Sequence, residues 1–281
     1  MMNEGKIQWS LIPPELGPAP TGETNLIWIT SEEHVELVKW WDELNRRRDG
    51  INMLDWSEDD EFAATVSTYS IIIANRPEDA DLYFQRGIAL SNLEQFDEAI
   101  ADFDKALSLD PQHAGAQLYR AQIQSAIAGI LNDRGCLHIE SGNLTLALED
   151  FDEAIRLDPT NAITYSNRGA LHSKLGQLQR AIEDYGAAIR CDPDYANSYA
   201  NRAFVYYKLG EYEKGIADCE QALALRPNHS NTYINRGHCF AGLGDSERAA
   251  ADFRFALAPP CEPGEGELKE ARDGLRALGL E

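Results

Sequence analysis

The sequence has few basic residues: 25 lysines and arginines stand against 47 aspartates and glutamates, which gives a net charge of −22. A surface of this sign repels the phosphates of nucleic acids, so we do not expect DNA or RNA as a partner. The charge favours a neutral or basic protein partner, and an acidic surface also aids solubility without any binding role.

Long hydrophobic runs are also missing. No stretch reaches the roughly 18 consecutive apolar residues of a membrane-spanning helix. The residues from Met1 to Lys6 show no apolar core of a secretory signal peptide. We therefore expect the protein to be cytoplasmic and not to associate with a membrane.

Cysteine is sparse and catalytic motifs are absent. The five cysteines form no Cys-x-x-Cys pair, and their odd number fits reduced thiols better than a disulfide framework. No Cys/His set has the spacing of zinc ligands. The chain contains no G-x-G-x-x-G, Walker A, H-E-x-x-H or G-x-S-x-G motif. We expect no enzymatic activity, no metal and no cofactor.

Four sequence markers recur in the chain with one period of 34 residues. The first is an Arg followed by Gly or Ala, at Arg134, Arg168, Arg202 and Arg236. The others are a small residue, an aromatic residue and a closing proline, such as Ala147, Phe151 and Pro159 in the copy that contains Arg134. One earlier copy, around Arg86, carries the same markers.

This combination resembles the tetratricopeptide repeat, in which each copy is a pair of antiparallel helices. The resemblance implies an all-α fold, a right-handed superhelical solenoid in which neighbouring pairs bury each other's apolar faces. We place five full repeats at residues 80–113, 128–161, 162–195, 196–229 and 230–263. The glycines of the first helices imply close helix–helix approach, because glycine inside a helix otherwise costs about 1 kcal/mol relative to alanine.

The remaining residues flank or interrupt the array. The 14-residue insertion between the first two repeats is close to four helical turns, and it predicts one long helix or two short ones. A second helix of a degenerate repeat is expected over residues 59–76. The flanking segments are a proline-rich extended or disordered tail (1–28), an N-terminal helical cap with the degenerate repeat (29–79), the insertion (114–127) and a C-terminal capping helix (264–281).

Each full repeat also contains an arginine and, 16 residues later, an aspartate. We interpret these as ion pairs between the two helices of a repeat, which is a structural role. The pairs are Arg86 with Asp102, Arg134 with Asp150, Arg168 with Asp184, Arg202 with Asp218, and Arg236 with Asp252.

In the family that the chain resembles, the first helices line a concave groove that holds an extended peptide or a partner helix. Carried over repeat by repeat, this predicts polar, aromatic and aliphatic lining residues, with two lysines able to accept a carboxylate. They are Asn167, Asn201, Asn235, Asn197, Phe204, Tyr207, Lys174, Lys208, Ile163, Ile234, Phe84 and Ile88. Alternatively, the asparagines bond neighbouring first helices to each other, and the sequence leaves both roles open.

One partner of the family is not expected. Heat-shock cochaperones with these repeats hold a C-terminal carboxylate with a Lys/Asn/Asn/Lys/Arg clamp. The matching places here hold Asn132, Cys136, Asn167, Asn197 and Asn201, or one repeat later Ser166, Ala170, Asn201, Asn231 and Asn235. Neither set contains the clamp's cations.

The resemblance therefore implies an adaptor or scaffold that binds another protein or peptide. Two other functions remain open: a regulatory or accessory subunit that acts through its N-terminal segment, and a self-associating scaffold. The proline-rich tail could also occupy the chain's own groove.

Overall fold

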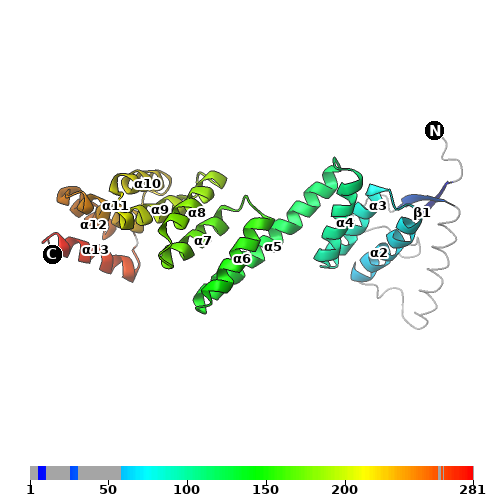
Figure 1. The fold of residues 1–281 in the computed structure, drawn as a ribbon, viewed down its shortest axis with the longest axis horizontal. Coiled ribbons are helices and arrows are strands. Elements are labelled where there is room, and N and C mark those ends of the chain that lie inside the picture. The colour runs from blue at the N-terminus through cyan, green and yellow to red at the C-terminus, as the bar shows by residue number, and fades with distance from the viewer. Residues whose placement is uncertain (1–5, 11–25, 31–57, 259–260, 262, 281) are drawn as a thin grey trace. The chain divides into compact units, whose positions relative to one another are not determined.

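The structure, a computed structural model, describes residues 6–10, 26–30, 58–258, 261 and 263–280 (Figure 1). Within these residues it has twelve helices and two strands. The helices are α2 (Glu58–Asn75), α3 (Ala80–Asn92), α4 (Phe96–Leu109), α5 (Ala114–Glu140), α6 (Leu144–Leu157), α7 (Ala162–Lys174), α8 (Leu178–Cys191), α9 (Ala196–Leu209), α10 (Tyr212–Leu225), α11 (Ser230–Gly242), α12 (Ser246–Ala256) and α13 (Glu265–Ala277).

The two strands are the part of the fold that the sequence did not predict. Strands β1 (Lys6–Ser10) and β2 (Leu26–Thr30) pair antiparallel, with Ile7 opposite Ile29. The sequence Leu-Ile-Trp-Ile-Thr of β2 is rich in β-branched and aromatic residues, which favour strands. The rest of the expected tail, and residues 31–57 of the expected cap, lie outside the described residues.

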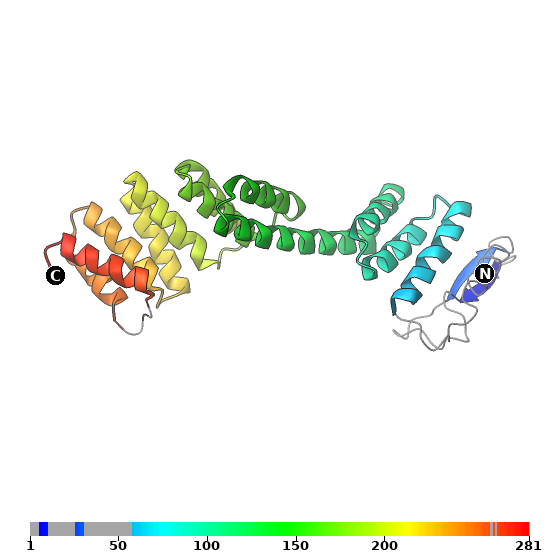
Figure 2. The same cartoon turned by 90° about the horizontal axis from the view of Figure 1, so that it is seen from below.

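The chain divides into two compact units, Met1–Gln124 and Ser125–Glu281. In the second unit, α7 to α12 form three successive antiparallel pairs, and α13 packs on α11 and α12 (Figures 1 and 2). Contacts between repeats run from a second helix to the next first helix, as in α8–α9. They also run between first helices, in α7–α9 and α9–α11. The first helices therefore form one surface of the unit, with the second helices behind them.

Helix α5 is a single helix across the insertion, which is one of the two predicted alternatives. The division between the units falls inside it, after Gln124. In the first unit, the N-terminal part of α5 packs on the first full repeat. The rings of Tyr119 and Phe84 lie 5.6 Å apart between centroids, and Arg120 pairs with Asp104 at 2.5 Å. This part of α5 thus covers the first repeat much as a following repeat would.

Glycines let the two helices of a pair approach closely, as the sequence predicted. A Cβ atom at Gly135 would lie 2.7 Å from the ring of Phe151, and one at Gly237 would lie 2.8 Å from the ring of Phe253. Both rings are fully buried. Another set of glycines ends the first helices with φ near +77°, where glycine avoids the steric cost of a side chain. These are Gly142 (+79°), Gly176 (+75°), Gly210 (+76°) and Gly244 (+79°).

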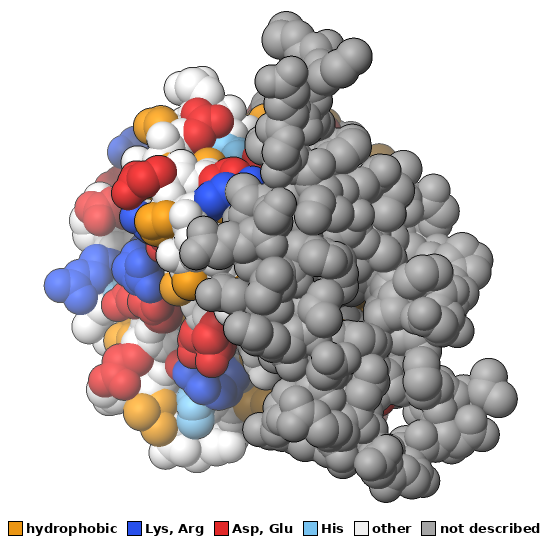
Figure 3. Space-filling view, turned by 90° about the vertical axis from the view of Figure 1, so that its right-hand side faces the viewer, with side chains coloured by type: hydrophobic (Ala, Val, Ile, Leu, Met, Phe, Trp, Pro, Cys, Tyr) orange, Lys and Arg blue, Asp and Glu red, His pale blue; other side chains and the backbone are white. Residues whose placement is uncertain are grey.

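Charged side chains of both signs lie on the described part of the face drawn in Figure 3. There, acidic side chains lie beside basic and hydrophobic ones. Among the described residues of that face, the excess negative charge is therefore not gathered into one acidic patch.

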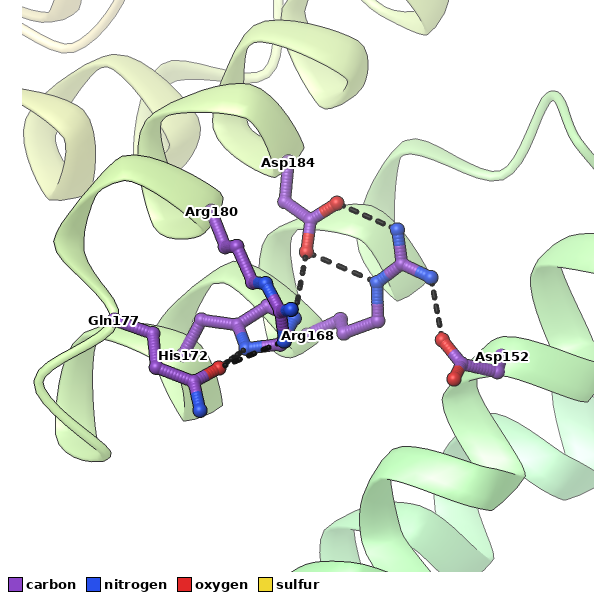
Figure 4. A network of polar contacts seen from close by, with 6 residues as sticks. All are labelled: Asp152, Arg168, His172, Gln177, Arg180 and Asp184. Carbon is purple, nitrogen blue, oxygen red and sulfur yellow. Dashed lines mark hydrogen bonds and ion pairs between the residues drawn. The ribbon is translucent and has the colours of Figure 1, made fainter.

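The predicted ion pairs between helices are present in all five repeats. In each, the guanidinium donates two hydrogen bonds to one carboxylate, as from Arg168 to Asp184 at 2.9 and 2.6 Å (Figure 4). The other pairs are Arg86–Asp102, Arg134–Asp150, Arg202–Asp218 and Arg236–Asp252, with distances from 2.5 to 2.9 Å. The five aspartates are buried, so each needs its partner, and the structural interpretation of these residues is confirmed.

Candidate functional site

Helix α9 presents a row of side chains at the centre of the first-helix surface. Asn197, Asn201, Phe204 and Lys208 are spaced four, three and four residues apart, which places them on one helix face. The first three are half-buried and Lys208 is exposed. The Lys208 ammonium lies 4.4 Å from the centroid of the Phe204 ring, a cation–π contact. This row offers amide, aromatic and cationic groups to a ligand.

Helix α7 carries the equivalent row one repeat earlier. Ile163 is 50% exposed and Lys174 is exposed. The amide of Asn167, however, donates to Oδ1 of Asn132 at 2.9 Å and to Sγ of Cys136 at 3.5 Å, both on α5. Asn167 therefore bonds two neighbouring first helices, which is the alternative role left open by the sequence.

Two predicted lining residues of α11 are not accessible. Ile234 is 0% exposed and belongs to the core with Phe253. Asn235 is 2% exposed, and its amide donates to the carbonyl oxygen of Ala200 on α9 at 3.1 Å. We correct the predicted lining accordingly: Ile234 packs the core, and Asn235 links two first helices.

Phe84 and Ile88 lie in the first unit, on α3. Phe84 occupies the repeat position of Ile234, and it is enclosed by other groups. Its ring lies 4.6 Å from that of His113, and a Cβ at Gly115 would lie 2.6 Å from it. Phe84 is thus a packing residue as well. Ile88 is half-buried and shares its repeat position with Phe204.

Tyr207 lines a pocket that the sequence did not predict. The pocket has a volume of ≈ 560 Å³. It lies between α13 and residues of α9, α10, α11 and α12. Tyr207, Tyr212 and His238 contribute rings, while α13 contributes Glu270 and Asp273. His238 could have been found by register, because it lies 34 residues after Phe204. The predicted lining did not extend to α13, which follows the fifth repeat, although Ala271 keeps the 34-residue step from Gly237.

Neither a cluster of potential metal ligands nor a membrane-spanning helix is found in the described part of the chain. The described residues contain no cluster of three or more His, Cys, Asp or Glu side chains that could hold a metal ion. None of the helices in the described part of the chain is long and apolar enough to span a membrane.

Comparison with protein families identifies the repeats. A family model of the TPR repeat matches residues 135–176 and 172–210, and one of the tetratricopeptide repeat matches residues 80–113 and 196–229. This chain is a tetratricopeptide repeat protein. Arrays of these repeats are scaffolds for protein–protein interaction, and protein binding is therefore the general function of the chain.

Individual tetratricopeptide repeat proteins match parts of the chain. Human mitochondrial import receptor subunit TOM70 is 34% identical over a stretch covering 32% of this chain and 19% of that receptor. The crystal structure of MamA covers 69% of this chain and 94% of its own, with 25% identity and a TM-score of 0.43. The second TPR domain of human RPAP3, in complex with the HSP70 peptide SGPTIEEVD, covers 43% of this chain and 96% of its own. Its identity is 35% and its TM-score 0.38.

Proposed function

We propose that the chain is an adaptor that binds an extended segment of a partner protein along the first helices of the second unit. The row on α9 is the centre of the proposed site, with α7 on one side and the pocket near α13 on the other. The contacting residues are Asn197, Asn201, Phe204, Tyr207, Lys208, Ile163 and Lys174.

The observation that carries this proposal is the row of polar, aromatic and cationic side chains on α9. These side chains are half-buried or exposed, and they do not belong to the core. An asparagine amide both donates and accepts, so Asn201 can bond the backbone of an extended peptide. No hydrogen bond within the described residues is assigned to the side chain of Asn201, unlike those of Asn167 and Asn235. Phe204 supplies an aromatic anchor next to it. These are the components that a peptide groove needs.

The charge of the chain suggests the chemistry of the partner. A net charge of −22 favours a neutral or basic segment over a polyanion. Lys174 and Lys208, at matching positions of successive repeats, would each accept a single carboxylate of that segment. A heat-shock C-terminal tail fits poorly. At the clamp positions Asn132 carries a neutral amide and Cys136 a thiol, so neither supplies a cation.

The proposal is tested by selecting peptides from a random library on the full-length chain and measuring their affinity by fluorescence anisotropy. We expect selected peptides to bind with micromolar Kd and to lose about tenfold or more in affinity to the Asn201→Ala/Phe204→Ala variant, because aromatic anchors dominate such interfaces. The peptide SGPTIEEVD is expected not to bind.

A matched control is the Gln179→Ala/Glu183→Ala variant, which removes two exposed side chains from the second helix α8. It should bind the selected peptides like the natural chain. Equal loss in both variants, or retention in both, would reject the first-helix site. Light scattering on the same samples distinguishes peptide binding from self-association, since a monomer at the concentrations used excludes the latter.

A further inference from the structure

The pocket beside α13 has a flat aromatic side. The rings of Tyr207 and His238 are stacked with centroids 5.2 Å apart and an angle of 25° between planes. The ring of Tyr212 lies 6.2 Å from that of Tyr207. Gly242 makes this arrangement possible, because a Cβ there would lie 2.5 Å from the Tyr212 ring. Tyr212 therefore rests directly on the backbone of α11.

The opposite side of the pocket, formed by α13, is polar. Glu270 lies 3.3 Å from Nε2 of His238, and this hydrogen bond lowers the pKa of the Glu270 carboxyl, which keeps it ionised at neutral pH. Asp273 also lines the pocket and pairs with Arg276, one turn further along α13, at 2.8 Å. Lys269 is the single cation among the described residues that line the pocket, and it is exposed.

Rings beside a carboxylate recur elsewhere in this protein, where an arginine of the chain lies between them. Arg168 lies 5.7 Å from the centroid of the Tyr165 ring while it bonds Asp184. The same combination occurs at Arg86 with Tyr83 and Asp102, at Arg202 with Tyr199 and Asp218, and at Arg236 with Tyr233 and Asp252. At the pocket, Tyr207, Tyr212 and Glu270 supply the ring and the carboxylate, and no arginine is among the described lining residues.

We infer that the pocket takes an arginine side chain from the partner segment, with its guanidinium against Tyr207 and Tyr212 and its N–H groups donating to Glu270. This inference rests on the proposed function, since it assigns one residue of the bound segment. Arginine suits the pocket better than lysine because its planar cation stacks on rings and donates along a fixed fork. The apolar wall formed by Ala241, Ala277 and Leu278 would contact its aliphatic stem.

The inference is tested by nuclear magnetic resonance on the full-length chain with labelled tyrosine rings, titrated with the capped tripeptide Gly-Arg-Gly. Tyr→Phe variants assign the signals of Tyr207 and Tyr212. We expect these two signals to shift with a millimolar Kd. The same tripeptide with citrulline, which keeps the shape of arginine without its charge, should bind about tenfold more weakly.

The variant Glu270→Gln should weaken binding of the arginine tripeptide by about tenfold, because it removes the charge and keeps the shape. Glu265→Gln, in the first turn of the same helix and outside the pocket, is the matched control and should bind normally. Equal binding of the citrulline tripeptide, shifts at other tyrosines, or an unchanged Kd in Glu270→Gln would each overturn the inference.

The outcomes of this test and of the library selection distinguish a wrong arginine assignment from a wrong proposed function. If selected peptides bind the α9 row while the arginine tripeptide does not shift Tyr212, the arginine assignment is wrong and the proposed function stands. If the tripeptide binds as expected but no selected peptide depends on Asn201 and Phe204, the extended site is wrong, and the pocket remains as an isolated arginine site.

Discussion

Arg168 donates a hydrogen bond of 2.5 Å to Asp152 on α6, the second helix of the preceding repeat (Figure 4). The same guanidinium bonds Asp184 within its own repeat, so one side chain joins three helices. Burial alone would lower the pKa of Arg168, but the hydrogen bonds to Asp184 and Asp152 outweigh it and raise the pKa. The two carboxylates differ in exposure, since the side chain of Asp152 is 63% exposed and that of Asp184 is 8% exposed.

We therefore expect unequal effects from removing the two carboxylates. Asp184→Ala should lower the free energy of unfolding by about 3–5 kcal/mol, because it leaves a partly buried charge without its main partner. Asp152→Ala should lower it by less than about 1 kcal/mol, as is usual for exposed ion pairs. Urea denaturation followed by circular dichroism measures both. Similar losses in the two variants would show that the link between repeats matters as much as the pair within one.

Gly186 offers no carboxylate to the arginine of the next repeat, Arg202. Gly186 lies 34 residues after Asp152, and a Cβ there would lie 3.6 Å from Nη1 of Arg202, an ordinary contact. Gly186→Ala should stabilise the chain by about 1 kcal/mol through helix propensity alone. Gly186→Asp should stabilise it through a new pair with Arg202, and only this gain should shrink in high salt.

The control for these variants is Gly142→Ala, because Gly142 has φ of +79°. It should destabilise the chain by about 1–2 kcal/mol, since a side chain disfavours this conformation. Thermal unfolding of the three variants at low and high salt provides the comparison. If Gly186→Asp is no more salt-dependent than Gly186→Ala, the introduced carboxylate does not reach Arg202.

The asparagines of the first helices should separate into structural and binding residues. Asn235→Ala removes a buried hydrogen bond between two first helices, while the carbonyl of Ala200 keeps its bond within α9, so we expect a loss of about 1 kcal/mol in stability. Asn201→Ala should leave stability within about 0.5 kcal/mol and act on peptide affinity instead. Chemical denaturation beside anisotropy with a selected peptide distinguishes them. The prediction is wrong if Asn201→Ala destabilises the chain as much as Asn235→Ala does.

The thiols should differ in reactivity. Cys191 is exposed, whereas Cys219, Cys239 and Cys261 are buried. Burial raises the pKa of Cys239 to about 12 and also raises the pKa of Cys219, so both stay protonated under mildly alkaline conditions, where only the thiolate reacts. In the folded chain, Ellman's reagent should modify Cys191 rapidly. All five cysteines should react in denaturant. Rapid reaction of Cys219 in the folded state would contradict its position.

The sequence predicted the helices because their signals are local and repeated. A glycine on the first helix, an aromatic residue on the second and a closing proline mark most of the pairs, and Phe151 fills the space beside Gly135 as expected. The arginine–aspartate pairs were also predictable, since both partners recur at one spacing. Helix α5 was only half-predicted, because 14 extra residues suit either one long helix or two short ones.

The candidate site was less predictable, because exposure depends on packing between elements. Ile234 was placed in the predicted lining by carry-over from the family, yet the neighbouring helices bury it completely. The asparagine spacing alone did not separate Asn235, which bonds Ala200, from Asn201. The pocket at Tyr212 and Glu270 forms only when α13 packs on the last repeat, and the sequence pattern does not show which side chains of α13 line it.

The ion pair inside each repeat has a consequence for how such a chain can change over evolutionary time. Its two members lie 16 positions apart, inside one 34-residue block. When a whole block is duplicated or deleted, both charges are therefore gained or lost together, and neither is left without its partner. The bond from Arg168 to Asp152 is an exception, because it crosses the boundary between blocks. Recombination at that boundary would separate its members, whereas recombination one repeat later, where Gly186 takes the aspartate's place, would separate no such pair.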